Sequence, residues 1–337
     1  MARKKQGKVA GAADEIIQRI PLACTDEDEA VRFFEDMRWG DNAKDAGCPK
    51  CGDTNCYRMT ARDGSREKSY RWRCRGCGKQ FSVRTGTVYE ESRIPLRHWA
   101  FAFWAACASK KGVSAKQIQR QTGLSYKSAL FMMHRIRWAM RPEDKPKLTG
   151  TVEADETWVG GRPRYRPVHT KKIRADITRN NWQTRYDRKT PVFAAVQRGG
   201  EVRTRVMSEV TGRTLKQAVL DHVDLSARLM TDELNTYTTV GKMFEGGHDR
   251  IKHSRKIYVR GDITTNTVES FFAILKRGIN GVYHSVSREH LQRYLDEFEF
   301  RYNARKLTDG ERTQKAIRQA DGKRLHYKEP VSNKRAG

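Results

Sequence analysis

Four cysteines in the first third of the chain have the type and spacing that bind a metal ion. Cys48 and Cys51 form one Cys-x-x-Cys pair, and Cys74 and Cys77 form a second pair after 22 intervening residues. Each pair puts two thiolates on one tight turn, and four sulfurs are the tetrahedral set that Zn²⁺ prefers in structural sites. Such a set leaves no open position for catalysis. We therefore predict one structural Zn²⁺ in a zinc ribbon. Cys56 lies between the pairs and could compete as a ligand, but we interpret it as an ordinary small residue.

A second kind of chemistry is suggested by acidic residues in otherwise apolar surroundings. Asp155 lies inside the β-like run 151–159. A charged residue is costly in a strand that should be part of the core, unless it has a task there. Its neighbours Glu153 and Glu156 are equally acidic, and spacing alone does not exclude either of them. The run therefore predicts a functional carboxylate, with Asp155 as the first choice.

Two further acids follow later in the chain. Asp232 comes directly after a short apolar strand-like run, and functional groups are common at the carboxyl ends of strands in α/β sheets. Glu269 lies in an amphipathic helical segment, and Lys276 falls on the same face two turns later. Asn266 lies on a neighbouring face and is a secondary candidate.

Three carboxylates from separate elements suit phosphoryl transfer on nucleic acid. Two Mg²⁺ or Mn²⁺ ions can activate an attacking oxygen and stabilise a leaving one, and hard cations of this kind prefer carboxylate ligands. Asp155, Asp232 and Glu269 would hold the ions, and Lys276 would hold a phosphate beside them. Each acid taken singly is equally well explained as a surface charge, so the prediction depends on the set.

The order of predicted elements indicates a multidomain protein. Alternating short strands and helices from residue 151 onward indicate an α/β domain with a mixed sheet and flanking helices. We expect the helix after the N-terminal tail to begin at Thr25, where Asp28 completes a capping pattern. The predicted boundaries are a basic tail at 1–24, a helix with the zinc ribbon at 25–90, a helical region at 91–145, the α/β domain at 146–305 and a basic tail at 306–337. The predicted strands are 151–159, 191–197, 201–207 and 228–231, and the predicted later helices are 213–222, 265–277 and 287–304.

The helical region contains a helix-turn-helix pattern. Ser114 and Ser125 can cap two successive helices, and Gly123 can adopt the left-handed turn between them. The start of the second helix would then face base edges in DNA. The alternative is a helical linker between domains. The side chains predicted to contact DNA here are Tyr126, Lys127, Ser128 and Arg135.

The net charge indicates a polyanionic partner. The chain carries 67 Lys and Arg against 40 Asp and Glu, for a formal charge of +27. Basic side chains gain affinity for DNA by releasing its condensed counterions. The segment 160–189 contributes ten basic residues, Lys171 and Lys172 among them, and could clamp DNA or contact nothing. No apolar run is long enough for a membrane span and no secretory signal is visible, so we expect a reducing cytoplasm.

Taken together, these motifs resemble those of the zinc-ribbon-bearing DDE transposases of bacterial insertion sequences, the ISXO2-like group. The segments that carry the resemblance are 153–161, 190–193, 231–233, 266–272, 275–278 and 282–286. The resemblance implies an RNase H-like catalytic domain, two catalytic cations per site held by Asp155, Asp232 and Glu269, and Lys276 as the matching lysine.

The resemblance also implies an activity and partners. The expected reaction is hydrolysis at the ends of a mobile element, followed by transfer of the freed 3′-OH into double-stranded target DNA by a dimer or larger assembly. His253 is a secondary candidate near the site. Two alternatives remain open, which are a DNA-binding regulator descended from a transposase and a metal-dependent nuclease that cuts without joining.

Overall fold

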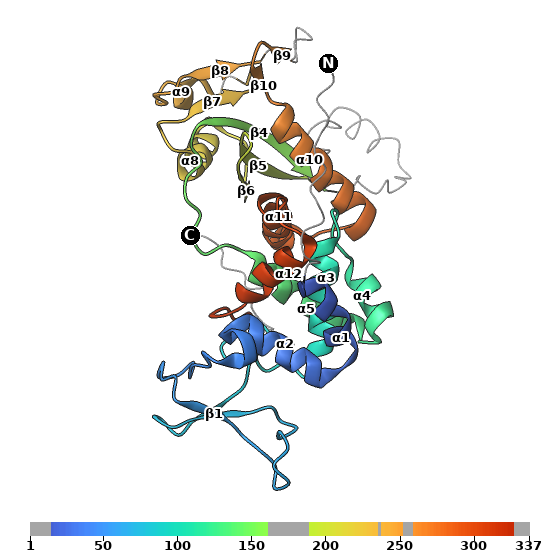
Figure 1. Cartoon of the computed structure of the whole chain (residues 1–337). Coiled ribbons are helices and arrows are strands. Elements are labelled where there is room, and N and C mark those ends of the chain that lie inside the picture. Colours follow the sequence, from blue (N-terminus) through green and yellow to red (C-terminus); the bar gives the residue numbers. More distant parts are fainter. Residues whose placement is uncertain (1–14, 161–188, 235–236, 252–258, 327–337) are drawn as a thin grey trace, which may run out of the picture. The chain divides into compact units, whose positions relative to one another are not determined.

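The structure is a computed structural model, and it describes residues 15–160, 189–234, 237–251 and 259–326 (Figure 1). The described residues belong to two compact units. The first contains the chain up to residue 141 together with the part from residue 304 onward, and the second contains residues 142–303. Three predicted site residues lie outside the described residues: Lys171, Lys172 and His253.

Helices surround an aromatic core in the first unit. They are α1 (Glu15–Thr25), α2 (Glu27–Trp39), η1 (Asp41–Ala43), α3 (Leu96–Ala108), α4 (Ala115–Thr122), α5 (Tyr126–Met140) and α12 (Asp309–Arg318). Phe34 packs edge-on against Tyr89 and Phe103 at the centre of this core. None of the helices in the described ranges has the length and apolar character needed to cross a membrane.

The N-terminal helices differ from the prediction. Residues 15–24, expected to be part of a tail, form most of α1, whose Ile20 and Ala23 are buried. The second helix begins at Glu27, two residues after the predicted start at Thr25, and its cap is Asp26. The Asp26 carboxylate accepts a hydrogen bond of 2.8 Å from the Glu29 amide.

The predicted C-terminal tail is also wrong for residues 309–318. They form α12, which has a capping box between Thr308 and Glu311 and buries Ala316 and Ile317 in the first unit. Beyond this helix, the Lys323 ammonium is buried and donates a hydrogen bond of 2.9 Å to the carbonyl of Ala139 at the end of α5. The many basic residues of this segment led to the prediction of a tail, although its short apolar stripe is buried in the first unit.

The zinc-ribbon segment forms a small antiparallel sheet in the order β1-β2-β3. Its strands are β1 (Cys56–Arg58), β2 (Trp72–Cys74) and β3 (Gln80–Phe81). Trp72 pairs with Phe81 and packs edge-on against Trp39 of α2. The Trp72 indole also donates a hydrogen bond of 2.7 Å to the fully buried Glu35 of α2. A carboxylate on α2 thus joins the ribbon to the helices.

The second unit is built on a mixed five-stranded sheet with the order β6-β5-β4-β7-β8. The strands are β4 (Thr151–Val159), β5 (Thr190–Gln197), β6 (Val202–Val206), β7 (Arg228–Thr231) and β8 (His248–Arg250). Strand β5 is antiparallel to both β4 and β6, whereas β7 lies parallel to both β4 and β8. The predicted strands agree with β4, β5, β6 and β7 to within one residue at each end.

Helices cover both faces of this sheet (Figure 1). They are α8 (Gly212–His222), α9 (Tyr237–Gly241), α10 (Asn266–Gly278), the π-helix η3 (Ile279–Tyr283) and α11 (Arg288–Asn303), and a short hairpin of β9 (Val259–Arg260) and β10 (Ile263–Thr264) precedes α10. Val152 and Ala154 of β4 share a core cluster with α8 and α9. Val159 of β4 shares the other cluster with α10 and α11. Alternate residues of β4 therefore face different helix layers.

Candidate metal centre and carboxylate site

The four predicted cysteines come together in the ribbon. Their sulfur atoms all lie within 4.8 Å of one another, and the pairs Cys48–Cys77 and Cys51–Cys74 are 3.7 and 3.6 Å apart. A tetrahedral site with Zn–S bonds of about 2.3 Å has sulfur–sulfur edges of about 3.8 Å. The cluster therefore fits a structural Zn²⁺ without rearrangement.

At Cys48 the local backbone also favours the thiolate form that zinc needs. Burial acts to raise the pKa of the Cys48 thiol, but hydrogen bonds from the amides of Lys50 and Cys51 outweigh it and lower the pKa to about 7. Cys56 is outside the cluster. Its thiol donates to the carbonyl of Asp53, and burial raises its pKa to about 11. The structure thus separates Cys56 from the zinc ligands.

The arginines of the ribbon divide into two groups. On the face that packs against α2, Arg66 forms an ion pair with the buried Glu35, and Arg58 lies over the ring of Trp72 with its guanidinium carbon 5.0 Å from the ring centre. On the opposite face, Arg73 is exposed and pairs across the sheet with the exposed Tyr57. The first group stabilises the ribbon, and the second group remains available to solvent.

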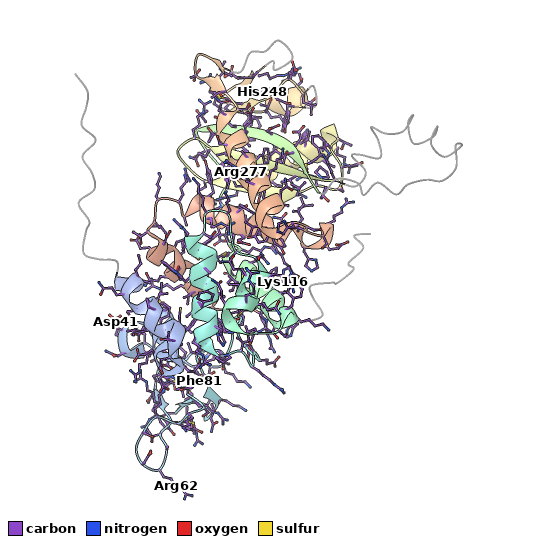
Figure 2. The ribbon with its side chains drawn as sticks, turned by 90° about the vertical axis from the view of Figure 1, so that its right-hand side faces the viewer. Asp41, Arg62, Phe81, Lys116, His248 and Arg277 are labelled. Atoms are coloured by element: carbon purple, nitrogen blue, oxygen red, sulfur yellow. The ribbon has the colours of Figure 1, made fainter. Side chains whose placement is uncertain are left out.

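Further arginines join the exposed group. Arg71 and Arg75 occupy alternate positions to either side of Arg73, so all three point to the same side of β2. The Arg75 guanidinium lies 5.0 Å from the centre of the Tyr57 ring. Arg62 lies at the far end of the ribbon (Figure 2). Within the described residues, Arg71, Arg73 and Arg75 take part in no ion pair.

Asp155 and Asp232 are placed level with each other by two neighbouring parallel strands. The register of β4 and β7 puts Glu153 opposite Met230. Two residues further along each strand are Asp155, which lies at the centre of β4, and Asp232, which directly follows β7. The Asp232 carboxylate accepts a hydrogen bond of 3.0 Å from the Leu234 amide, which holds it in a tight turn at the strand end.

Glu269 enters from the helix that covers the same face of β4 as Asp155. It lies in the first turn of α10, and its carboxylate accepts a hydrogen bond of 3.0 Å from the Thr265 hydroxyl. Lys276 is exposed two turns further along the same helix, and Asn266 is exposed at its first residue. The fold thus brings Asp155, Asp232 and Glu269 into one electrostatic group.

The pKa of Asp155 shows how closely these acids interact. Burial raises the pKa of Asp155 to about 8, and the charges of Glu156, Asp232 and Glu269 add to the effect. Burial likewise raises the pKa of Glu156 to about 7. Acids in such surroundings repel one another, and a bound cation would relieve both the desolvation and the repulsion.

The donor set fits hard divalent cations, although the acids are less tightly gathered than the thiols. Among the described residues, the ligand atoms of Asp155, Asp232 and Glu269 do not all lie within 4.8 Å of one another, as those of the cysteines do. Ligands arranged around two ions about 3.5–4 Å apart need not meet that limit. Carboxylate oxygens on three separate elements remain the ligand type that Mg²⁺ and Mn²⁺ prefer.

The two acidic neighbours of Asp155 have other partners. Glu153 points to the same face as Asp155 but is fully buried, and it accepts hydrogen bonds from Arg198 and from the first turn of α10. Glu156 points to the opposite face, where the Tyr237 hydroxyl donates to it at 2.6 Å. Sequence reasoning missed Arg198 and Tyr237, because no local pattern connects them to β4.

The helices α4 and α5 have the predicted caps and turn. The Ser114 and Ser125 hydroxyls accept hydrogen bonds of 3.1 and 3.2 Å from Gln117 and Ser128, and Gly123 has a left-handed φ of 73°. Tyr126 and Lys127 are exposed at the start of α5.

The side chains predicted to contact DNA are not equally accessible. The Lys116 ammonium lies 4.6 Å from the centre of the Tyr126 ring, on the surface seen in Figure 2. Arg135 differs from the prediction, because it is buried and donates a hydrogen bond of 2.9 Å to the carbonyl of Glu90. Its guanidinium supports the fold and is a poor candidate for a phosphate contact.

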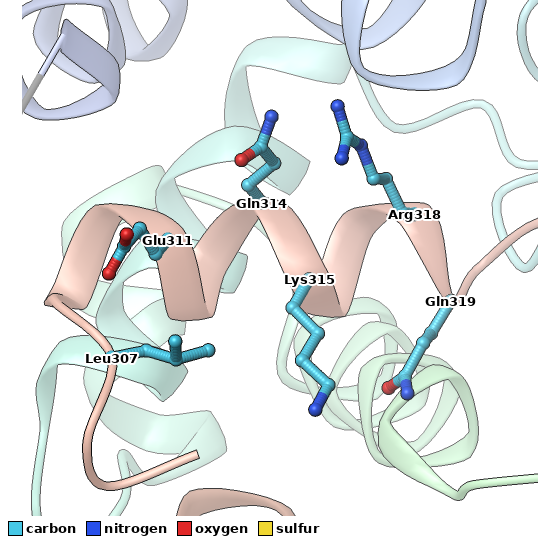
Figure 3. Close-up of a pocket in the computed structure, with 6 residues that line it drawn as sticks. All are labelled: Leu307, Glu311, Gln314, Lys315, Arg318 and Gln319. Carbon is cyan, nitrogen blue, oxygen red and sulfur yellow. The ribbon is translucent and has the colours of Figure 1, made fainter.

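A shallow pocket of about 470 Å³ lies along α12 of the first unit (Figure 3). Its lining residues are Leu307, Glu311, Gln314, Lys315, Arg318 and Gln319. One carboxylate beside two cations is not a metal site, so this pocket adds nothing to the carboxylate chemistry.

Comparison with known proteins matches two segments of the chain to transposase domains. Residues 147–303 match the family described as the ISXO2-like transposase domain, and residues 25–80 match the transposase zinc-ribbon domain. A protein of Halobacterium salinarum, described as an uncharacterized protein in transposable element ISH50, is 28% identical over 280 residues, which cover 82% of this chain and 90% of that protein. No solved structure matches the chain.

Proposed function

Because the chain belongs to the ISXO2-like transposases and carries the transposase zinc ribbon, we propose that it cuts DNA at the ends of an insertion element and joins the freed 3′-OH to target DNA. The observation that carries the proposal is the placement of Asp155 and Asp232 level on neighbouring parallel strands, with Glu269 on the helix that covers the same face as Asp155. A DNA-binding regulator would have no use for this group of acids.

We assign the three acids the role of holding two Mg²⁺ or Mn²⁺ ions. Ions bound there would activate the attacking oxygen and stabilise the leaving oxygen of an in-line displacement. Asp155 and Asp232 are fixed by the sheet, whereas Glu269 is fixed by the start of α10. Lys276 lies on the same helix face as Glu269 and would hold a phosphate of the bound strand.

The RNase H-like fold is part of this proposal. It is supported by the sheet, in which three antiparallel strands are followed by two strands parallel to the first. We further propose that α4 and α5 act as a helix-turn-helix, with Tyr126, Lys127 and Ser128 toward the bases. The exposed Arg71, Arg73 and Arg75 of the ribbon would contact phosphates. At least two copies would be needed to bring both element ends together.

The test uses purified protein with a labelled element end and a supercoiled plasmid, in Mg²⁺ and in EDTA. The main variant is Glu269→Gln, and its control is Glu245→Gln, which alters an exposed acid of the same unit. We expect metal-dependent joined products that are lost only in Glu269→Gln, with DNA binding retained in both. Cleavage without joining would favour a nuclease. Binding without either product, under several metals and end sequences, would leave a regulator.

A further inference from the structure

The first turn of α10 is capped by a carboxylate from the sheet and not by its own N-cap residue. Thr265, at the N-cap position, caps none of the backbone amides with its side chain. Instead, the amides of Thr267 and Val268 donate hydrogen bonds of 2.7 and 3.2 Å to Glu153 of β4. The Thr267 hydroxyl donates a third bond of 2.9 Å.

The remaining amides at the start of α10 also have partners. The Asn266 amide donates to the Thr264 hydroxyl, and the Glu269 amide donates to the carbonyl of Thr265. All four amides of the first turn are therefore satisfied, two of them by Glu153. A negative charge at a helix N-terminus is also favoured by the helix dipole. The start of α10 is thus attached to one point on β4.

Arg198 holds the other side of the same carboxylate. Its Nε donates a hydrogen bond of 2.8 Å to Glu153, and its two terminal nitrogens donate to the carbonyls of Asp262 and Thr264 at 2.7 and 3.2 Å. Arg198 follows β5, whereas Asp262 and Thr264 belong to the segment that leads into α10. A planar guanidinium can make these bonds simultaneously, and an ammonium cannot do so with the same geometry.

The position of Glu153 relates this contact to the carboxylate site. Glu153 lies two residues before Asp155 on the same face of β4, and Thr267 lies two residues before Glu269 on α10. The contact therefore joins the two elements that carry Asp155 and Glu269, which are 114 residues apart in the chain. We propose that Glu153 and Arg198 are positioning residues. Their contact with the start of α10, called the latch below, sets the separation of Asp155 and Glu269 and so the affinity of the site for cations.

This role rests on the proposed function and is different from that of a metal ligand. Glu153 is fully buried, and its oxygens already accept bonds from the Thr267 amide and hydroxyl, the Val268 amide and Arg198. A carboxylate engaged in this way has no oxygen directed at a cation. Outer partners that orient the direct ligands typically change metal affinity or activity about ten- to a hundred-fold when they are mutated.

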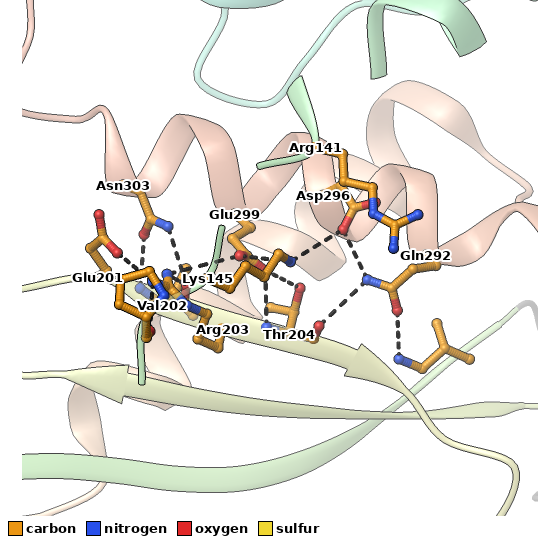
Figure 4. Close-up of polar contacts among 12 residues, drawn as sticks. Arg141, Lys145, Glu201, Val202, Arg203, Thr204, Gln292, Asp296, Glu299 and Asn303 are labelled. Carbon is orange, nitrogen blue, oxygen red and sulfur yellow. Dashed lines mark hydrogen bonds and ion pairs between the residues drawn. The ribbon is translucent and has the colours of Figure 1, made fainter. Parts of the chain in front are cut away.

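Glu299 offers a matched control within the same unit (Figure 4). It is also fully buried, it accepts bonds of 3.0 and 2.9 Å from the amide and hydroxyl of Thr204, and it pairs with Lys145 at 3.0 Å. It lies on α11 and bonds to the middle of the edge strand β6, and neither Thr204 nor Lys145 belongs to the start of α10. Replacing either glutamate by glutamine removes one buried charge from a comparable set of contacts.

The experiment compares Glu153→Gln, Arg198→Lys and Glu299→Gln in the full-length, zinc-loaded protein. Calorimetric titration with Mn²⁺ alone, without DNA, measures cation affinity. DNA affinity is measured in EDTA, and kcat and KM are measured for cleavage of the element end. Arg198→Lys keeps the positive charge, so it tests the latch even if Glu153→Gln folds poorly.

We expect Glu153→Gln and Arg198→Lys to weaken Mn²⁺ binding and lower kcat about ten- to a hundred-fold, with KM and DNA affinity nearly unchanged. Glu299→Gln should lower the melting temperature but keep the Mn²⁺ affinity of the wild type. The latch is refuted if Glu153→Gln binds Mn²⁺ normally or if Glu299→Gln weakens binding equally. Wild-type protein that binds Mn²⁺ but neither cuts nor joins DNA would overturn the proposed function, while a dependence of that binding on Glu153 would still support the latch.

Discussion

The Tyr237 hydroxyl donates a hydrogen bond of 2.6 Å to Glu156, on the face of β4 opposite to the one that carries Asp155. Glu156 and Asp155 are adjacent in sequence, but the alternation of a strand sends them to different helix layers. Tyr237 is itself buried, and burial together with the Glu156 charge raises its pKa. The pair belongs to the core beneath the carboxylate site.

This relationship predicts different consequences for two neighbouring acids. Tyr237→Phe should lower the free energy of unfolding by about 1–3 kcal/mol, because a buried carboxylate loses its hydrogen-bond donor. DNA cleavage per folded molecule should stay near the wild-type rate, whereas Asp155→Asn should abolish it. Urea unfolding and single-turnover cleavage measure the two effects. A loss of cleavage in Tyr237→Phe as severe as in Asp155→Asn would mean that Glu156 belongs to the reacting site.

Removal of zinc should unfold the ribbon and leave the second unit intact. Cys48→Ser, or chelation of the metal, takes away a ligand from a four-sulfur site whose binding energy contributes directly to folding. We expect loss of bound zinc and rapid proteolysis between residues 44 and 80, with no change in the melting of the second unit. Cys56→Ser is the control and should keep its zinc. Zinc loss in Cys56→Ser would show that this thiol is a ligand after all.

The two groups of ribbon arginines should behave differently. Arg73→Ala removes an exposed cation without an ion pair, so it should weaken DNA binding and reduce the slope of log K against log salt by about one. Arg66→Ala instead removes the nearer of the two arginines that form ion pairs with the buried Glu35, the other being Arg58, so its main effect should be loss of ribbon stability. Binding titrations at several salt concentrations, with melting curves, separate these outcomes. Equal salt slopes for Arg73→Ala and the wild type would remove Arg73 from the DNA-binding surface.

Acid should destabilise the second unit through His222. Burial, followed by the nearby charge of Lys145, lowers the pKa of His222 to about 4, and its ring stacks on Phe193 with a centroid separation of 6.3 Å. The unfolded chain, with an ordinary histidine pKa of about 6.5, binds the proton first. Stability should therefore fall as the pH drops from about 6.5 to 4, by about 2 kcal/mol for this group after allowance for partial solvent screening.

The check is the pH dependence of urea unfolding in the wild type and in His222→Gln. The variant cannot take up a proton at this position, so its stability should change less between pH 6.5 and pH 4. Above pH 7 the free energies of unfolding of the two proteins should differ only by a constant amount that is due to packing. Identical slopes in the two proteins would show that His222 is not the group that titrates.

Local patterns in the sequence were sufficient for four strands of the larger sheet, for the caps of α4 and α5 and for the zinc ligands, but not for α1 and α12. The strands from β4 to β7 follow their apolar patterns to within a residue, and the caps at Ser114 and Ser125 form because a hydroxyl bonds an amide three residues away. The Cys-x-x-Cys pairs each place two sulfurs on one turn. Interactions of this kind span a few residues, so composition and spacing determine them.

Tertiary structure decided which of several similar side chains has which task. The roles of Glu153 and Glu156 depend on partners 45 to 115 residues away, at Arg198, at Tyr237 and at the start of α10. The division of the ribbon arginines depends on Glu35 in another helix, and the C-terminal segment packs as α12 in the N-terminal unit. Spacing along the chain carries no information on such pairings, because they form only when packing brings remote segments together and removes their polar groups from water.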